Sequence, residues 1–316
     1  MAAVSMTTIT DRVERELRIP GLASLLAERL EPSDLQSLLL DVYRRKAAKR
    51  ATGDVLSDYS TNRFVRPSAI PPAHYLDWDR VALSQLPPDF EAIELSPVCP
   101  LGTTSALSGL GQGRVLTTTR NTEVVSDSTN VLALEAATRR RKSRSSAPTH
   151  LAASHRLLRT QHYDNPKLSA HFRVFSLCSA GRDRGDARFE IEAIAQHVAF
   201  YVKAARAFVG RLLPLRVTLT VLSENAALRA GAEQLLDRFR NELGEIEAAF
   251  DPDRTAGREY YRTLCFGIAA RDDAGQPIHL VDGGCVDWTQ KLLSDVKERL
   301  VISGVGSDRV CTMRNG

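Results

Sequence analysis

Residues 300–309 read LVISGVGSDR, an apolar run that ends in a turn containing Gly304, Gly306 and Arg309. The run predicts a strand over residues 300–303, followed by a glycine turn and a short helical tail. Glycines let the backbone approach a ligand closely, and an arginine on the next turn can hold a phosphate or lie over a flat base. An ordinary strand-to-helix turn with a surface arginine has the same pattern, so the stretch needs support from other segments.

An arginine-rich segment upstream gives that support. Residues 172–178 and 188–193 predict two strands joined by a glycine- and charge-rich loop, with Arg173 on the first strand. Period-two geometry places three charged residues of the return strand on one face, Arg188, Glu190 and Glu192, and Phe189 on the other. We expect the charged face to bind a polyanion such as triphosphate, although a solvated edge strand would show the same alternation.

The remaining pattern predicts an α+β fold, an antiparallel sheet with helices packed on it, because strands outnumber any strand–helix–strand alternation. Further strands are predicted at residues 90–95, 116–119, 216–222, 260–270 and 278–281, the last two joined by a turn at 272–275. Helices are predicted at residues 76–86, 130–141, from 193 through 213, 226–250 and 289–299.

The N-terminal segment has a different character. Residues 11–50 predict amphipathic helix, since four apolar residues recur at three- and four-residue steps, Leu35, Leu38, Leu39 and Val42. Prolines at positions 67, 71 and 72 then interrupt any helix. We therefore expect an N-terminal helical extension over residues 1–60 and a core over residues 61–316, with the extension available to recruit a protein partner.

Composition narrows the class of protein. The chain has 43% hydrophobic and 25% charged residues and a net charge of +4, the balance of a globular protein. The basic runs at residues 44–46 and 139–142 fall where predicted helices end, so they suit the helix dipole and do not by themselves establish a nucleic-acid partner. No apolar run is long enough for a signal peptide or a membrane span, so we expect a cytoplasmic protein without a membrane partner.

Three segments, in order, resemble the signature motifs of the class II aminoacyl-tRNA synthetases. Residues 90–97 resemble motif 1, Phe172 and Arg173 with Arg188 to Glu190 resemble motif 2, and residues 304–309 match the glycine-x-glycine-x-x-arginine of motif 3. The histidyl branch is the nearest in pattern, because GREYY at residues 257–261 followed by CFG at 265–267 resembles its tyrosine-pair strand. The pair Gly283 and Gly284 resembles the glycine loop that follows.

The resemblance implies ATP and Mg²⁺ as ligands. Arg173 would hold the α-phosphate, Arg188 the γ-phosphate, and Arg309 would stack on adenine. The nucleotide would also contact Phe189, Glu190, Glu192, Gly304 and Gly306, with Glu190 and Glu192 holding the metal. The amino-acid substrate would contact five further residues, Arg120, Glu123, Tyr260, Gly283 and Gly284.

The implied activity is adenylation of an amino acid or related small carboxylate. Motif 1 further implies a homodimer, with apolar surface from Trp78, Val81 and Leu86. Seven residues follow Arg309, so we expect no anticodon-binding domain and leave tRNA open as a partner.

Three departures from the pattern favour an alternative. Phe175 stands where motif 2 has an acid, Ala256 where the tyrosine-pair strand has an arginine, and Cys285 breaks the glycine loop. Arg254 and Arg258 are the nearest substitutes for the missing arginine. The alternative is a non-catalytic histidyl-synthetase-like subunit of the ATP phosphoribosyltransferase regulatory type, which senses a ligand in a hetero-oligomer. An RNA-binding scaffold built on the N-terminal extension is a third possibility.

Overall fold

The computed structural model describes residues 8–143, 147–161, 169–210, 213–258, 260–271 and 275–314. The chain divides into two compact units. The first contains Met1–Asn62 and Thr117–Thr122, and the second contains Arg63–Leu116 and Glu123–Gly316. The independence of residues 1–60 as a domain stays a prediction.

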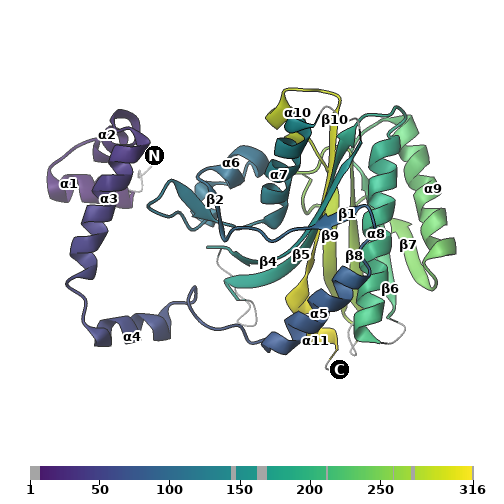
Figure 1. Cartoon of the computed structure of the whole chain (residues 1–316), viewed down its shortest axis with the longest axis horizontal. Coiled ribbons are helices and arrows are strands. Elements are labelled where there is room, and N and C mark those ends of the chain that lie inside the picture. The colour runs from purple at the N-terminus through teal and green to yellow at the C-terminus, as the bar shows by residue number, and fades with distance from the viewer. Residues whose placement is uncertain are drawn as a thin grey trace, which may run out of the picture. The chain divides into compact units, whose positions relative to one another are not determined.

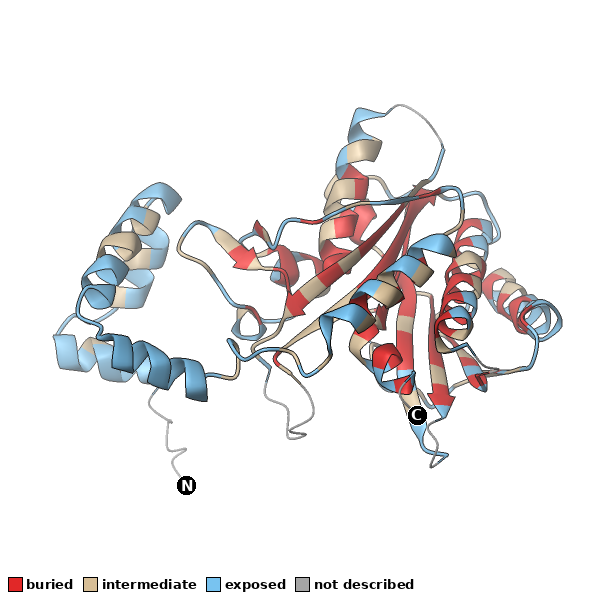
Figure 2. Cartoon of the chain, turned by 60° about the horizontal axis from the view of Figure 1, so that its bottom comes forward, coloured by how far each residue is buried: buried red, intermediate tan, exposed pale blue. Residues whose placement is uncertain are grey.

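The first unit is helical, with α1 (Ile9–Leu17), α2 (Leu22–Arg29), α3 (Pro32–Ala47) and α4 (Thr52–Thr61). Thr8 and Asp11 form a capping box at the start of α1. Left-handed backbone at Arg18 (φ 55°) and Gly21 (φ 70°) separates α1 from α2, so the segment expected as continuous helix is broken. None of the four helices has a buried residue, and Figure 2 colours them mostly as exposed.

The second unit is built on an eight-stranded sheet (Figure 1). In spatial order its strands are β1 (Phe90–Ala92), β4 (Thr149–Leu158), β5 (His171–Arg182), β10 (Glu298–Gly306), β9 (Pro277–Val286), β8 (Leu264–Arg271), β6 (Leu215–Val221) and β7 (Ile246–Phe250). The six inner strands are antiparallel, whereas β1 and β7 pair in parallel at the two edges. The sheet is therefore mixed at its edges and antiparallel inside. A small second sheet pairs β2 (Val98–Pro100) with β3 (Thr122–Val124).

Helices cover both faces of the large sheet (Figure 1). One face packs against α5 (Pro72–Ser84), α8 (Arg188–Val209), α9 (Ala226–Glu242) and α11 (Ser307–Met313). The other packs against α6 (Thr103–Ser108), α7 (Ser128–Lys142) and α10 (Trp288–Leu293). Alternate residues of β4, β5 and β10 enter one core or the other, so these strands are buried on both sides (Figure 2). We call the two sides the α8 face and the α7 face.

The strand expected at residues 188–193 is wrong, because these residues form the first turns of α8. The six-residue alternation is too short to separate a period of 2 from one of 3.6, and Phe189 and Ala193 are buried at helical spacing. The hairpin is instead β4 with β5, in which Arg156 lies opposite Arg173. Strand β4 was missed because its alanines and histidines favour strands weakly, and pairing with β5 decides its conformation.

Other boundaries also differ from expectation. The helix expected over residues 226–250 ends at Glu242, since Gly244 (φ 69°) turns the chain into β7. The helix expected over 289–299 ends at Leu293, and β10 begins at Glu298. The strand expected at 116–119 lies instead at β3. Residues 272–274 of the expected 272–275 turn lie outside the described residues.

The basic run at the end of α7 fastens the helix to its surroundings. Arg140 pairs with Glu298 at 2.6 Å, and the two side chains are only 5% and 4% exposed. Arg139 pairs with Glu91 at 2.5 Å, and Arg141 donates to the Leu292 carbonyl at 2.8 Å. These contacts explain the run as a structural anchor.

We predict that Arg140→Met destabilises the protein by about 3–5 kcal/mol, because it leaves the Glu298 carboxylate buried without its main partner. Arg141→Met is the matched control and removes one hydrogen bond of about 1 kcal/mol. Urea unfolding of the two variants measures the difference. Equal losses would mean that the buried pair does not hold α7 to the sheet.

A chain of hydrogen bonds runs through the α8-face core. His150 Nδ1 lies 2.8 Å from the Ser179 hydroxyl, which lies 2.9 Å from His197 Nε2. His197 Nδ1 in turn lies 2.7 Å from the hydroxyl of Ser303 on β10. Burial lowers the pKa of His197 to about 3, so the imidazole is neutral in the folded protein.

This histidine makes stability depend on pH. An unfolded histidine titrates at about 6.5, so below that pH the unfolded chain binds a proton that folded His197 does not. The contribution of His197 to the free energy of unfolding is therefore fully present above about pH 6.5, and it is lost as the pH decreases towards 3. We predict a lower urea midpoint at pH 4.5 than at pH 7, with a smaller difference in His197→Gln. The same difference in both proteins would assign the acid sensitivity to other groups.

Candidate functional site

Gly304 and Gly306 lie in the last three residues of β10, so the turn expected after residue 303 is wrong. Gly304 lies on the α7 face. Gly304 is flanked by Asp282 on β9 and Ser176 on β5. A Cβ atom on Gly304 would lie 2.9 Å from Val174 Cγ1, whereas at Gly306 the nearest atom is 3.7 Å away, on Arg309. Arg309 is exposed on the first turn of α11, and its Nη1 donates to the His279 carbonyl at 2.5 Å. This end of β10 is the starting point of the site.

Arg173 points to the opposite face of the sheet. Its side chain alternates with Val174 and pairs with Asp79 on α5. Its guanidinium also lies 5.4 Å from the centre of the Tyr75 ring, and its backbone N–H donates to Asp308 Oδ2 at 2.8 Å. Arg173 therefore connects α5, β5 and α11 on the α8 face, the side of the sheet opposite Gly304.

Arg188 lies near the other end of β5. Val174 pairs with Gly306 and Arg182 pairs with Glu298, and the nine residue steps from Arg173 to Arg182 span about 30 Å of strand. Arg188 follows on α8, with a 64% exposed side chain 3.8 Å from Asp186. The structure does not bring Arg188 together with Arg173 and Arg309.

The side chains expected to hold magnesium do not fit a metal. Glu190 is buried and pairs with Arg299 at 3.0 Å, and burial raises the pKa of its carboxyl. Glu192 is exposed and pairs with Arg184. Phe189 is 3% exposed and packs on Gly181 in the core.

Across the described ranges, no group of three or more His, Cys, Asp and Glu residues could hold a metal ion. Arg188 also lies away from Arg173, so the structure does not bring the residues expected to bind ATP and Mg²⁺ together.

Glu123 holds the start of α6 in place on the α7 side of the sheet. Its carboxylate accepts hydrogen bonds from the backbone N–H groups of Gly102 and Thr104 at 2.8 and 2.9 Å, at the start of α6. Burial opposes ionisation, but these bonds and one from Gln112 hold the pKa of Glu123 below its usual value. Arg120 lies in the Thr117–Thr122 segment of the first unit, where its N–H donates to Thr118 Oγ1.

The two glycines of β9 allow close packing. A Cβ atom on Gly283 would lie 2.5 Å from the Phe266 ring, and one on Gly284 would lie 2.7 Å from the ring of Tyr261. Tyr260 and Tyr261 contact edge to face at 4.9 Å, and Tyr260 contacts Trp288 in the same way at 5.2 Å. Because Gly284 has no side chain, the ring of Tyr261 can pack directly on β9, and the tyrosine pair lies against the α7 face of the sheet.

A carboxylate and an arginine meet the tyrosine pair. Asp282 Oδ2 accepts from the Tyr261 hydroxyl at 3.0 Å, and Asp282 Oδ1 accepts from Arg254 at 2.5 Å. The Arg254 side chain is 8% exposed, whereas that of Asp282 is 42% exposed. Arg254 also donates to the Ala256 carbonyl at 2.8 Å, so its guanidinium lies beside the position where the pattern lacks an arginine. Asp282 is therefore a solvent-accessible carboxylate that is paired with a buried arginine.

A second carboxylate lies at the start of α7. Asp127 caps that helix by accepting from the Thr129 N–H at 3.0 Å, and the hydroxyls of Ser128 and Ser176, 2.7 Å apart, hold the turn against β5. Arg159 lies 3.5 Å from Asp127. Burial, and next the carboxylate of Asp127, raise the pKa of Tyr260 well above its ordinary value. The tyrosines therefore link the two charged pairs.

We call this set the α7-face cluster: Asp127, Arg159, Tyr260, Tyr261, Arg254 and Asp282. Of these, Tyr260 was a candidate from the sequence and Arg254 was considered as a substitute. Asp127 was missed because the helix was expected to begin at residue 130, although an aspartate before Ser128 is an N-cap signal. Asp282 directly precedes the glycine pair, which was the available signal for it.

No model of a protein family and no curated protein matches this sequence. Solved structures do match. Apo histidyl-tRNA synthetase from S. aureus is 14% identical, with a TM-score of 0.58 over 78% of this chain and 68% of that one. A Bacillus halodurans protein described as an ATP phosphoribosyltransferase regulatory subunit/histidyl-tRNA synthetase is 16% identical, with a TM-score of 0.55 over 79% and 83%. A histidine–tRNA ligase subunit from Alicyclobacillus acidocaldarius is 12% identical, with a TM-score of 0.54 over 79% and 97%. The chain has a class II synthetase-like fold.

Helix α5 carries Trp78 and Val81, two of the three residues expected to supply dimer surface. Trp78 is fully buried against Phe175 and Phe208, so the expectation that it supplies dimer surface is wrong. The exposed apolar residues of α5 are Leu76 and Leu83, one heptad apart. A homodimer stays a prediction, and these two leucines are its available contacts. No described helix is long and apolar enough to cross a membrane.

The placement of the arginines predicts a large loss of stability from one substitution and a small change from another. Arg173→Met should lower the free energy of unfolding by about 1–3 kcal/mol, because it leaves the largely buried Asp79 without its charged partner. Arg188→Met should change it by less than about 0.5 kcal/mol, since that side chain is exposed. Thermal or urea unfolding distinguishes them. Comparable small effects would put Arg173 outside the structural core.

Proposed function

We propose that this chain is a non-catalytic, class II synthetase-like subunit that binds a small amino acid or a related zwitterion at the α7-face cluster. The observation that carries the proposal is the separation of the arginines. The face with Tyr260, Tyr261 and Asp282 lacks Arg173, which is paired with Asp79 behind the sheet. Without a convergent arginine clamp, the electrostatic stabilisation that adenylation needs is missing.

The cluster has the chemistry of a zwitterion site. Asp127 and Asp282 suit an ammonium group, and Arg159 and Arg254 suit a carboxylate. Asn130, on the first turn of α7, is 1% exposed, and both its amide atoms lack a hydrogen-bond partner among the described residues. A buried amide without partners costs free energy, which a polar ligand would recover. The regulatory-subunit description of the Bacillus halodurans structure agrees with a sensing role.

Adenylation remains the second candidate, and Arg309 is the observation that favours it. Its exposed guanidinium follows Gly306, the last residue of β10, and a flat base could lie against it. An adenylating protein would exchange pyrophosphate into ATP when given its amino acid. A sensing subunit would bind the amino acid and exchange nothing.

We predict that calorimetry with the twenty amino acids finds one ligand, and that pyrophosphate exchange with the same twenty gives no signal. Asp282→Asn should weaken binding about ten- to hundredfold, the loss of one charge-assisted contact. Asp237→Asn, on the outer surface of α9, is the control and should bind normally. Exchange with any amino acid would refute the non-catalytic assignment, and equal affinities in the two variants would move the ligand away from Asp282.

A further inference from the structure

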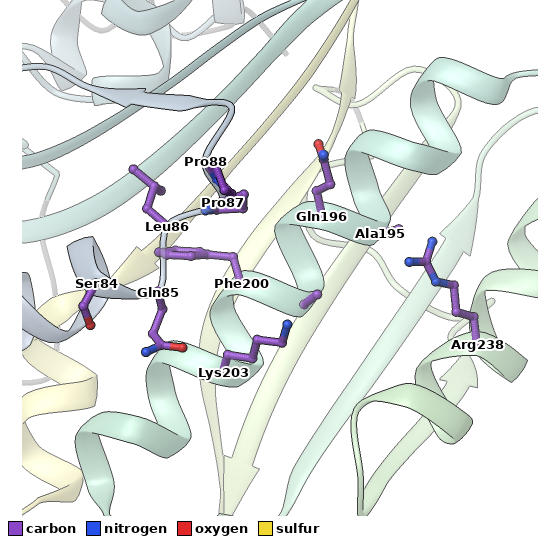
Figure 3. Close-up of a pocket in the computed structure, with 11 residues that line it drawn as sticks. Ser84, Gln85, Leu86, Pro87, Pro88, Ala195, Gln196, Phe200, Lys203 and Arg238 are labelled. Carbon is purple, nitrogen blue, oxygen red and sulfur yellow. The ribbon is translucent and has the colours of Figure 1, made fainter.

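A hollow of about 370 Å³ opens on the α8 face, on the other side of the sheet from the α7-face cluster. One wall is the segment that follows α5, with Leu86, Pro87 and Pro88. The other wall is α8, and Arg238 reaches the hollow from α9. Figure 3 shows the ring of Phe200 beside Leu86 and the two prolines, with Lys203 below it on the same helix.

Contacts with neighbouring residues fix the two walls of the hollow. Adjacent prolines fix the backbone, and the Phe90 N–H donates to the Pro87 carbonyl at 3.0 Å. The ring of Phe90 lies 4.9 Å from that of His150, and the Gln196 amide donates to Asp89 at 3.1 Å. Phe200, 1% exposed, stacks on Phe175 at 5.4 Å. A preformed hollow loses little entropy when a ligand enters it.

The charge of the hollow has one sign. None of its lining residues is acidic, and two of them are cationic, Lys203 and Arg238. Arg238 is partly neutralised by Glu242, 2.8 Å from its Nε. Lys203, in contrast, is exposed and has no ion pair or hydrogen bond among the residues that the structure describes. An apolar wall beside a free cation is complementary to an anion with an apolar body.

We propose that this hollow binds a small organic anion with a flat apolar body, of the aromatic carboxylate class. The ring would pack against Leu86, the two prolines and Ala199, in front of the buried Phe200, and the carboxylate would meet Lys203. The volume is at the small end of the range of about 300–1,000 Å³ typical of ligand pockets, which suits a single ring. The proposal is independent of the α7-face cluster, because the sheet separates the two.

Titration calorimetry with benzoate, benzamide and inorganic phosphate tests the proposal on the full chain. We expect benzoate to bind, benzamide to bind at least tenfold more weakly, and phosphate to give no heat. Lys203→Met, which keeps the aliphatic stem and removes the charge, should weaken benzoate binding at least tenfold. Lys49→Met, an exposed lysine on the first unit, should leave it unchanged.

A second variant tests the location. Ala199→Leu adds volume inside the hollow on a half-buried helix position and should abolish benzoate binding, with an unchanged circular dichroism spectrum and melting temperature as evidence of folding. The proposal is overturned if benzoate does not bind, if benzamide or phosphate binds as tightly, or if both Lys203→Met and Ala199→Leu bind benzoate like the unsubstituted chain.

Discussion

The alternation of side chains along β5 and β10 is the constraint on which the rest of this structure depends. Both strands are covered by helices on each side, so every residue is committed to one face. Gly304 and Ser176 share the α7 face, whereas Arg173 is turned to α5. One residue of register on β5 would exchange these assignments. Strand register therefore decides which side chains lie on the proposed binding face and which lie in the structural core behind it.

Much of the fold could be predicted from local patterns, and the site could be predicted less well. The strand at residues 300–303 and the α+β class were expected from apolar runs, but the glycine turn was not confirmed, because β10 continues through Gly306. The β4–β5 hairpin was not, because β4 has weak strand propensity and depends on a partner over ten residues later. Arg188 was misplaced since a six-residue alternation fits both periods. Which face an arginine occupies depends on pairing that no local pattern reveals.

The α7-face cluster and the buried ion pairs of Arg140 and Arg173 illustrate two uses of charge. Arg140 and Arg173 are paired with Glu298 and Asp79, so their charges join elements that are distant in sequence. Arg254 is also buried and paired, but its partner Asp282 remains open. An open carboxylate next to a buried cation has its orientation fixed before a ligand arrives, which reduces the free energy lost on binding. This pre-organisation distinguishes a binding residue from a structural ion pair.

We propose above all that a ligand binds on the α7 face without a nucleotide clamp. A crystal structure grown with the bound amino acid and a non-hydrolysable ATP analogue tests it most directly. We expect the amino acid between Asp127 and Asp282, with no triphosphate bound by Arg173 or Arg188. A nucleotide whose phosphates contact those two arginines, or an amino acid bound away from Tyr260 and Tyr261, would contradict it.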